Sequence, residues 1–317
     1  MTQVYDKPQE HMGLPLPTAK VAIWLFLVTE IMFFTALIGT YIVLRHGTPA
    51  NSPHHWPTPH QVHLVEWIGA LNTFVLICSS LTIVLAHHAA VKADMKSAVK
   101  YIGMTLALGV VFLVVKAYEY NAKFQHDILP GYIGESLLFP KKSEEGKMTL
   151  DDLRAVEREK HDSAVGMQYF HRVHKQLEAV KDRSVEAELK TQCAALLADM
   201  DRTTVEGNPS QFQRPLSPAE VGERVNTLLD RAEEKKVDLH LTPAIPFGNL
   251  WASCYFTMTG LHALHVFIGI VVFAVVLLLA LVGRLGPQHA TMLELTGLYW
   301  HFVDIVWIFL FPLLSLV

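Results

Sequence analysis

Five long apolar stretches constrain the fold of this chain more than any other feature of its sequence. They cover residues 21–44, 63–86, 98–120, 250–282 and 292–317. Each is long enough for a helix that crosses the hydrocarbon core of a bilayer, which takes about 20 apolar residues. A helix also satisfies its own backbone hydrogen bonds, as a lipid environment requires. The sequence therefore predicts an all-α, polytopic membrane bundle of five transmembrane helices.

The composition is that of a membrane protein. Of the 317 residues, 51% are hydrophobic and 18% are charged, a balance that is too apolar for an ordinary soluble chain. The formal net charge of −4 argues against a nucleic acid as partner. The three cysteines form neither a CxxC pair nor a disulfide framework. The apolar run that begins at Val21 is too long for the core of a signal peptide, so we expect a retained membrane anchor.

Residues 121–246 separate the third apolar stretch from the fourth and are of a different kind. They hold 18 of the 26 Lys and Arg residues and 22 of the 30 Asp and Glu residues, so they cannot lie in lipid. Two motifs typical of helix starts, TLDD and SPAE, predict helices over about 150–200 and 218–236. A turn-rich linker, 206–216, joins them. We expect a soluble helical insertion, and both a solvated surface and a docking module for another subunit or an electron carrier fit its charges.

The charges of the short loops predict the orientation. The chain divides into an N-terminal segment 1–20, transmembrane helices 1–3 within 21–120, the insertion 121–246, and transmembrane helices 4–5 within 247–317. With the N-terminus inside, the inner loops hold Lys7, Lys20, Lys92, Lys96, Lys100 and Arg284, and the short outer loop holds Arg45. Basic residues favour the cytoplasmic side. We therefore expect an inner (plasma) membrane protein with a cytoplasmic N-terminus and a periplasmic insertion and C-terminus.

Ionisable and aromatic side chains recur inside the predicted spans, where a charge is costly unless it finds a partner. Residues three or four apart share one face of a helix, so His301 lies beside Asp304 and His262 beside His265. We expect lipid-binding or interhelical polar contacts for ten residues. They are Glu30, His87, His88, Glu119, His262, His265, Arg284, Trp300, His301 and Asp304.

The histidines of the last two spans also permit a metal site. A haem takes a histidine from each of two facing helices, and a copper centre takes several converging imidazoles; His262, His265 and His301 could supply them. An HxxH motif on one helix is not by itself such a pattern, and interior carboxylates offer the imidazoles polar partners instead. We therefore expect no metal ligand in this chain.

Two further interpretations concern ionisable side chains at the surface of the membrane and inside it. His87 and His88 precede three lysines, and this basic group fits the headgroups of anionic lipids. Glu30 and Glu119 fit either a proton relay or buried, hydrogen-bonded carboxyl groups.

Taken in order, the motifs of the five spans resemble subunit III of the haem-copper (cytochrome c type) oxidases. The first three spans contain WLFLVTEIMFF, LNTFVLICSSLTIVLAHHAAVKADMK and LGVVFLVVKAYEY. The last two contain the most specific motifs, TMTGLHALHVFIG and YWHFVDIVWIFLF. The chain resembles the five-helix bacterial form of this family, with a long extramembrane insertion about which the resemblance says nothing. Many members carry a buried Glu where this chain has Trp67, and Glu66 lies about 100° away around the helix.

The resemblance implies a non-catalytic accessory subunit of a proton-pumping terminal oxidase, in which the complex reduces O2 to water during aerobic respiratory electron transport. Such a subunit binds the side of the catalytic subunit I, holds phospholipids between its helices, protects the enzyme against inactivation during turnover and supports proton uptake at the inner surface. Haem and copper are then expected in partner subunits. The choice between cytochrome c and quinol as electron donor is expected to reside in other subunits.

Two other functions compete with this one. A self-contained membrane redox enzyme or ion transporter would use Glu30, Glu119 and the histidines directly. The second alternative is the related five-helix protein associated with nitric-oxide reductases. It shares the bundle with the oxidase subunit, so the catalytic subunit that accompanies this chain discriminates between the oxidase and the reductase.

Overall fold

Five long helices make up the membrane part of the protein. They are α1 (Thr18–His46), α2 (Glu66–Val91), α3 (Met95–Gln125), α7 (Gly248–Leu281) and α8 (Ala290–Ser315). The computed structural model describes residues 18–48, 56–134, 166–180, 186–201, 204–205, 208–212, 216, 218–284, 286 and 289–315. All five helices are long and apolar enough to cross a membrane, so the predicted polytopic helical membrane fold is confirmed.

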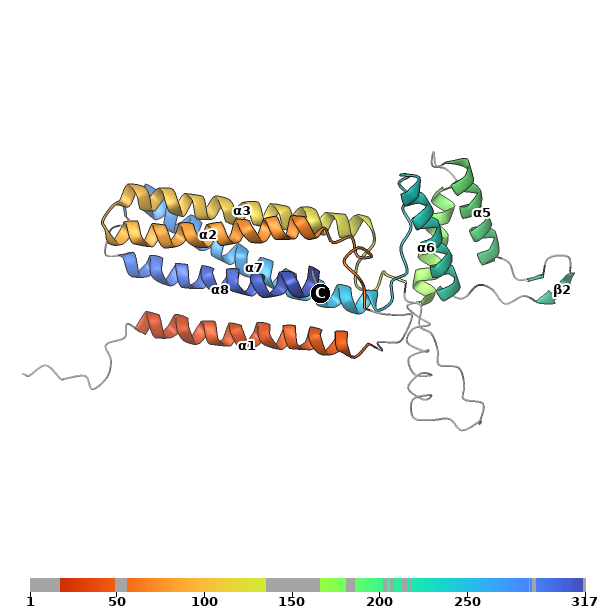
Figure 1. Ribbon diagram of the computed structural model, residues 1–317, viewed down its shortest axis with the longest axis horizontal. Coiled ribbons are helices and arrows are strands. Elements are labelled where there is room, and N and C mark those ends of the chain that lie inside the picture. The colour runs from red at the N-terminus through yellow and green to blue at the C-terminus, as the bar shows by residue number, and fades with distance from the viewer. Residues whose placement is uncertain are drawn as a thin grey trace, which may run out of the picture.

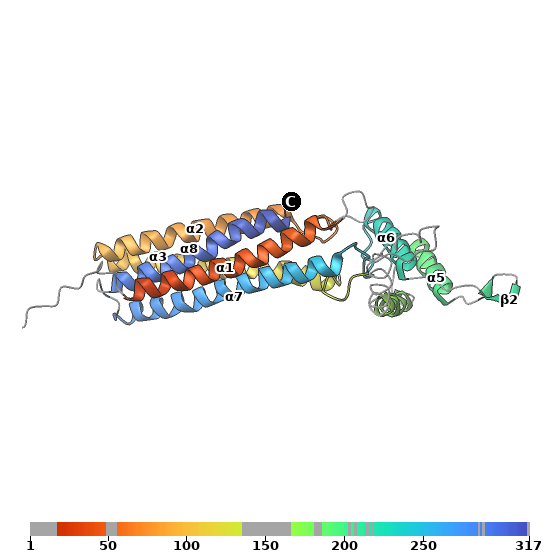
Figure 2. The same cartoon turned by 90° about the horizontal axis from the view of Figure 1, so that it is seen from below.

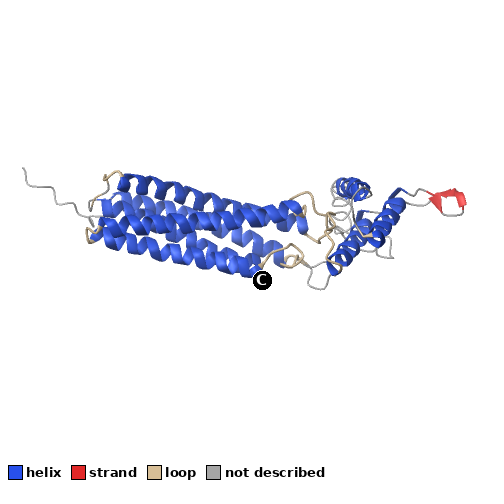
Figure 3. Ribbon diagram, turned by 90° about the horizontal axis from the view of Figure 1, so that it is seen from above, coloured by secondary structure: helices blue, strands red, loops and turns tan. Residues whose placement is uncertain are grey.

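The five helices run side by side in one elongated bundle, and the insertion lies beyond one end of it (Figures 1 and 3). α8 is the central helix, since it packs against α2, α7 and α1, while α3 packs against α2 and α7. Over its most apolar 18 residues, 56% of α8 is buried, against 11% of α1. α1 lies along one edge of the bundle (Figure 1) and packs against α7 and α8, between which it is seen in Figure 2.

α1 touches the bundle along a single narrow face. Its buried residues are Leu27, Phe34 and Tyr41, and a spacing of seven keeps them on one side of the helix. The other faces expose large apolar side chains, among them Leu25 at 64% and Met32 at 67%. A surface of this kind suits lipid or another membrane protein.

Trp300 fills the space between α8, α3 and α7. Its indole is 1% exposed, and its Nε1 donates to Ser79 Oγ of α2 at 2.9 Å. The ring lies against Gly109 of α3 and Gly269 of α7, where a Cβ atom would come within 2.9 and 2.6 Å of it. The absence of a side chain at these two positions lets the three helices close around a large aromatic ring.

The insertion forms a helical unit with a core of its own. The helix at residues 166–180, α5 (Ala187–Asp201) and α6 (Pro218–Glu234) bury a shared set of apolar side chains. These include Tyr169, Val173, Leu177, Leu189, Cys193, Leu196, Val221, Val225 and Leu228. The prediction of a helix over 218–236 is confirmed by α6.

Two expectations for the insertion are wrong in detail. Instead of one helix over about 150–200, the described part has two, at 166–180 and Ala187–Asp201, because both apolar faces fold onto the core that they share with α6. The expected turn-rich linker, 206–216, includes the strand β2 (Asn208–Phe212), which pairs antiparallel with β1 (Thr204–Val205) just before the linker. The TLDD motif and the serine of SPAE lie outside the described residues.

Hydrogen bonds tie the insertion to the end of the bundle. The Ile245 N–H donates to the Gly134 carbonyl at 2.8 Å, which joins the last part of the insertion to the chain that follows α3. Asp127, two residues beyond α3, accepts from Gln176 Nε2 at 2.8 Å and from the Thr242 hydroxyl at 2.9 Å. These contacts come from the beginning, middle and end of the insertion, so they hold it in place against the bundle.

Replacing Gly269 by Ala is expected to lower the free energy of unfolding by about 1–3 kcal/mol, the usual cost of overpacking, because the new methyl group meets the Trp300 ring. Thermal unfolding in detergent measures the effect. Gly103→Ala is the matched control, since nothing lies within 4 Å of its Cβ position, and it should be as stable as the parent or more stable by up to about 1 kcal/mol, because alanine favours a helix over glycine. Equal stabilities of the two variants would contradict the close packing around Trp300.

Candidate functional site

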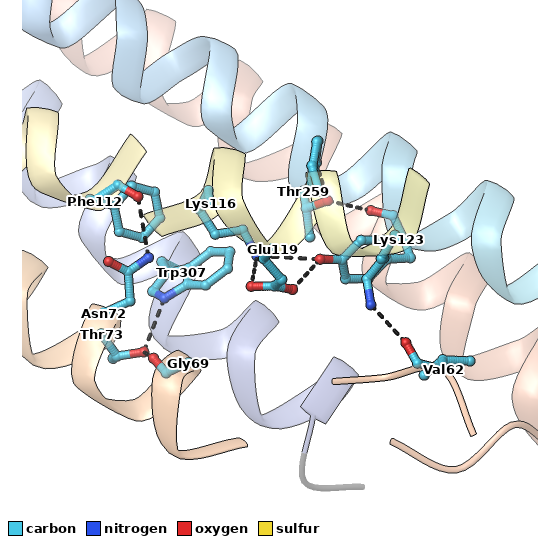
Figure 4. A network of polar contacts seen from close by, with 12 residues as sticks. Val62, Gly69, Asn72, Thr73, Phe112, Lys116, Glu119, Lys123, Thr259 and Trp307 are labelled. Atoms are coloured by element: carbon cyan, nitrogen blue, oxygen red, sulfur yellow. Dashed lines mark hydrogen bonds and ion pairs between the residues drawn. The ribbon is translucent and has the colours of Figure 1, made fainter. Parts of the chain in front are cut away.

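The most strongly charged part of the bundle interior lies in α3 near the insertion (Figure 4). Lys116 is 5% exposed and donates to Glu119 Oε2 at 2.9 Å. Tyr255 of α7 donates its hydroxyl to the other carboxylate oxygen and lies 3.4 Å from Lys116 Nζ. Both oxygens of Glu119 therefore have a partner, as a buried carboxylate requires.

A second buried lysine, Lys123, lies two turns after Lys116 in the same helix. Its side chain is 0% exposed, and its ammonium group donates to the Val62 carbonyl at 2.9 Å. The same nitrogen lies 5.4 Å from the centre of the Trp251 ring and 4.9 Å from that of Tyr255. Aromatic faces attract a desolvated cation, so two rings and a carbonyl stabilise an ammonium group that has no hydrogen-bonded carboxylate in the described part of the chain.

Trp307 of α8 links Lys116 to α2 and α7. Lys116 Nζ lies 4.7 Å from the centre of its ring, and its Nε1 donates to Thr73 Oγ1 of α2 at 3.0 Å. The ring of His262, which is 1% exposed, stacks on Trp307 at 4.9 Å. Neither nitrogen of His262 has a hydrogen-bond partner among the described residues.

A carboxylate–imidazole contact fastens α1 to α7 in the middle of the bundle. Glu30 Oε2 lies 3.1 Å from His265 Nε2, and His265 Nδ1 lies 2.8 Å from the Leu261 carbonyl one turn earlier. Tyr299 of α8 donates to the His265 carbonyl at 2.9 Å. Three helices therefore meet at His265, which explains how α1 is held although it buries so little surface.

The structure places His301 and Asp304 on the side of α8 that faces α2. His301 Nδ1 lies 2.5 Å from Ser80 Oγ. Asp304 is 6% exposed, and its Oδ1 has no hydrogen-bond partner within the described ranges. The interior histidines of α7, His262 and His265, are engaged elsewhere, because α7 turns them toward Trp307 and toward Glu30.

The remaining expected residues lie at the ends of the bundle. His87 is half-buried, and its Nδ1 has no hydrogen-bond partner among the residues described. His88 and Arg284 are exposed at the end away from the insertion. Three lysines are exposed there as well, namely Lys92, Lys96 and Lys100. Glu66, the first residue of α2, is exposed at the insertion end.

The residues that complete the buried cluster were not recognisable from the sequence. Lys123 falls in the segment that we expected to be extramembrane, whereas α3 continues to Gln125. The spacing of three between Lys116 and Glu119 signals a contact on one helix face. Nothing in the sequence connects Glu119 with Tyr255, which is 136 residues away in the chain.

Metal ligands do not gather in the described part of the chain. No three His, Cys, Asp or Glu side chains there come close enough to form a group that could hold a metal ion. The interior histidines are instead oriented by an indole, a carboxylate and a hydroxyl group, at His262, His265 and His301 respectively.

Fold and site together define a polytopic helical membrane protein whose buried charges and imidazoles contact neighbouring helices. The family model of cytochrome c oxidase subunit III matches residues 11–136 and 243–316. The matched residues include all five membrane helices and omit most of the insertion. This chain belongs to the cytochrome c oxidase subunit III family.

Proteins that are similar to this chain are named cytochrome c oxidase subunit 3. A cytochrome c oxidase subunit 3 from Thermostichus vulcanus is 45% identical over 67 residues, or 21% of this chain and 33% of the relative. One from Sus scrofa is 34% identical over 101 residues, 30% and 37% of the two chains. A probable cytochrome c oxidase subunit 3 from Rickettsia bellii is 31% identical over 122 residues, 35% and 44%. In each case the match spans less than half of the relative's length.

Replacing Glu30 by Met removes the group that His265 Nε2 contacts on α1. We expect a loss of about 1 kcal/mol in unfolding free energy, because a partly buried polar group loses its partner. Met32→Leu on the same helix is the control, since this side chain is 67% exposed and should be neutral within about 0.5 kcal/mol. The two variants are compared by calorimetry of the purified protein, and a Glu30 variant as stable as the control would refute a structural role for this contact.

Proposed function

We propose that this chain is the non-catalytic accessory subunit III of a proton-pumping haem-copper terminal oxidase. The match to the subunit III family in both parts of the bundle carries the proposal, and the names of the relatives agree with it. The contacts of the acidic side chains inside the bundle support the proposal too. Glu119 and Glu30, the acids that a redox or transport role would use, contact Lys116, Tyr255 and His265 across or along helices, which is what a stabilising bundle needs.

The main partner in this proposal is the catalytic subunit I, with other oxidase subunits around it. Haem and copper belong to those partners, and this chain stabilises the catalytic subunit. The surface of α1 supports such an assembly, because it buries one narrow face and exposes Trp24, Leu25 and Met32 by more than half. A contiguous apolar surface of this kind can be covered by a partner helix or by lipid.

The end of the bundle away from the insertion is the proposed cytoplasmic side. Its exposed His88, Lys92, Lys96, Lys100 and Arg284 follow the positive-inside rule, which puts the N-terminus in the cytoplasm and the insertion and the C-terminus in the periplasm. Basic side chains at the end of a membrane helix bundle lie at the level of the lipid headgroups and attract anionic phospholipids. We propose that this end holds phospholipid and supports proton uptake by the catalytic subunit.

Co-purification tests the proposal directly. An affinity-tagged copy of this chain, isolated from membranes in mild detergent, is expected to bring with it a catalytic subunit that contains haem and copper and reduces O2. The tagged chain, separated from its partners, should retain phospholipid and show no haem absorbance. A bis-histidine haem spectrum from the separated chain would contradict the non-catalytic role.

The same preparation separates the two competing functions. For the homologue associated with nitric-oxide reductases, the co-purified catalytic subunit would reduce nitric oxide and not O2. For a self-contained redox enzyme or transporter, the chain reconstituted alone would show turnover or ion flux that Glu119→Gln abolishes.

A further inference from the structure

Three polar side chains meet where α8 packs against α2. His301 Nδ1 of α8 lies 2.5 Å from Ser80 Oγ of α2, and the Ser80 hydroxyl is also a hydrogen-bonding neighbour of the Asp304 carboxyl group. Asp304 is 6% exposed, whereas Ser80 and His301 are half-buried. We call Ser80, His301 and Asp304 the α2–α8 polar cluster.

The second ring nitrogen of His301 faces outward. Nε2 has no hydrogen-bond partner among the residues that the structure describes, and the bundle does not enclose it, in contrast to both nitrogens of His262. Because Ser80 holds Nδ1, the imidazole ring is fixed and presents Nε2 at the surface. Either tautomer of a neutral imidazole leaves Nε2 able to form one more hydrogen bond, as donor or as acceptor.

The depth of His301 in the membrane decides what Nε2 can meet. His301 lies near the middle of α8, about 16 Å along the helix axis from Ala290, the first residue. The hydrocarbon core of a bilayer is about 30 Å thick, so the ring lies close to its centre and far from the lipid headgroups. Acyl chains surround a bundle at this depth, and they form no hydrogen bonds.

The surface around the α2–α8 polar cluster is apolar. Residues three, four or seven positions from Ser80 and His301 share their faces of α2 and α8. Four of these are between 40% and 52% exposed, namely Ile77, Val84, Ile305 and Ile308. The helices α2, α8 and α1 lie next to one another along one side of the bundle (Figure 2). His301 Nε2 is therefore a polar point in an otherwise apolar surface.

We propose that the α2–α8 polar cluster docks a membrane helix of another subunit, and that His301 Nε2 forms a hydrogen bond with a hydroxyl or amide side chain of that helix. Such side chains connect membrane helices to one another, and because they both donate and accept, they match either tautomer of His301. A charged side chain would be costly at this depth. Acyl chains would cover the apolar neighbours equally well, but they would leave Nε2 without a partner.

The proposal rests on the proposed function in one respect, namely that the chain is part of a multi-subunit complex. It is tested on the complex, after the haem spectrum has shown that a catalytic subunit is present. A negative result in such a preparation then contradicts the docking point alone and leaves the proposed function intact.

Two substitutions separate the outward hydrogen bond of His301 from the inward one. The amide of asparagine comes close to the position of Nδ1, so His301→Asn keeps a partner for Ser80 and loses the outward group. The longer glutamine brings its amide close to the position of Nε2, so His301→Gln keeps the outward group instead. The two variants therefore form a matched pair.

The measurement is the rate at which this chain dissociates from the purified complex in detergent. We expect the His301→Asn complex to dissociate about 5-fold faster than the parent, the effect of losing one hydrogen bond, and the His301→Gln complex to stay within about 2-fold of it. A purely structural role of the contact with Ser80 predicts the reverse order. An asparagine variant that dissociates no faster than the glutamine variant would overturn the proposal.

Photo-cross-linking in native membranes identifies the partner without relying on a change at His301. A benzophenone side chain replaces Ile305, which lies one turn after His301 and is 52% exposed. We expect mass spectrometry to find an adduct with a membrane span of another subunit that carries Ser, Thr, Asn or Gln. The same probe at Val111, which is 45% exposed on α3, should not give this adduct. Adducts of the Ile305 probe with lipid alone, or only with a second copy of this chain, would refute the docking point.

Discussion

Hydrocarbon offers no hydrogen bonds, so every polar side chain that enters this bundle depends on a partner from the protein. The structure meets this constraint for Glu119 and Glu30, whereas both nitrogens of His262 and Oδ1 of Asp304 have no hydrogen-bond partner among the described residues. Glu119 is held by Lys116 and by Tyr255 of α7, and Glu30 of α1 contacts His265 of α7. These contacts specify which helix faces meet, because non-specific apolar packing between helices in lipid is weak.

α8 concentrates the contacts that bring the other helices together. Its indoles donate to hydroxyl groups of α2, as Trp300 does to Ser79, and Gly109 and Gly269 make room for the Trp300 ring. α1, with one narrow face buried, leaves a large apolar surface. A central helix that packs on three neighbours and an outer helix that leaves most of its apolar surface uncovered agree with the proposed assembly of this chain with other subunits.

The membrane fold could be predicted from the sequence, because the length and hydropathy of a span are local properties. The stretch expected at 250–282 is α7, Gly248–Leu281. The partners could not be predicted, since they depend on which faces of distant helices meet. His301 lies against Ser80 and not His262 or His265, and Lys123, in a run that reads as soluble, is fully buried at the end of α3.

A double-mutant cycle at Lys116 and Glu119 tests most directly whether the buried charges satisfy one another. Unfolding free energies are measured for the parent, Lys116→Met, Glu119→Gln and the double variant. Lys116→Met alone should cost about 3–5 kcal/mol, because it leaves a carboxylate buried without its cation. The double variant should lose less than the sum of the single losses, with a coupling of about 0.5–3 kcal/mol. Strictly additive losses would show that the two side chains do not depend on each other and would contradict the account.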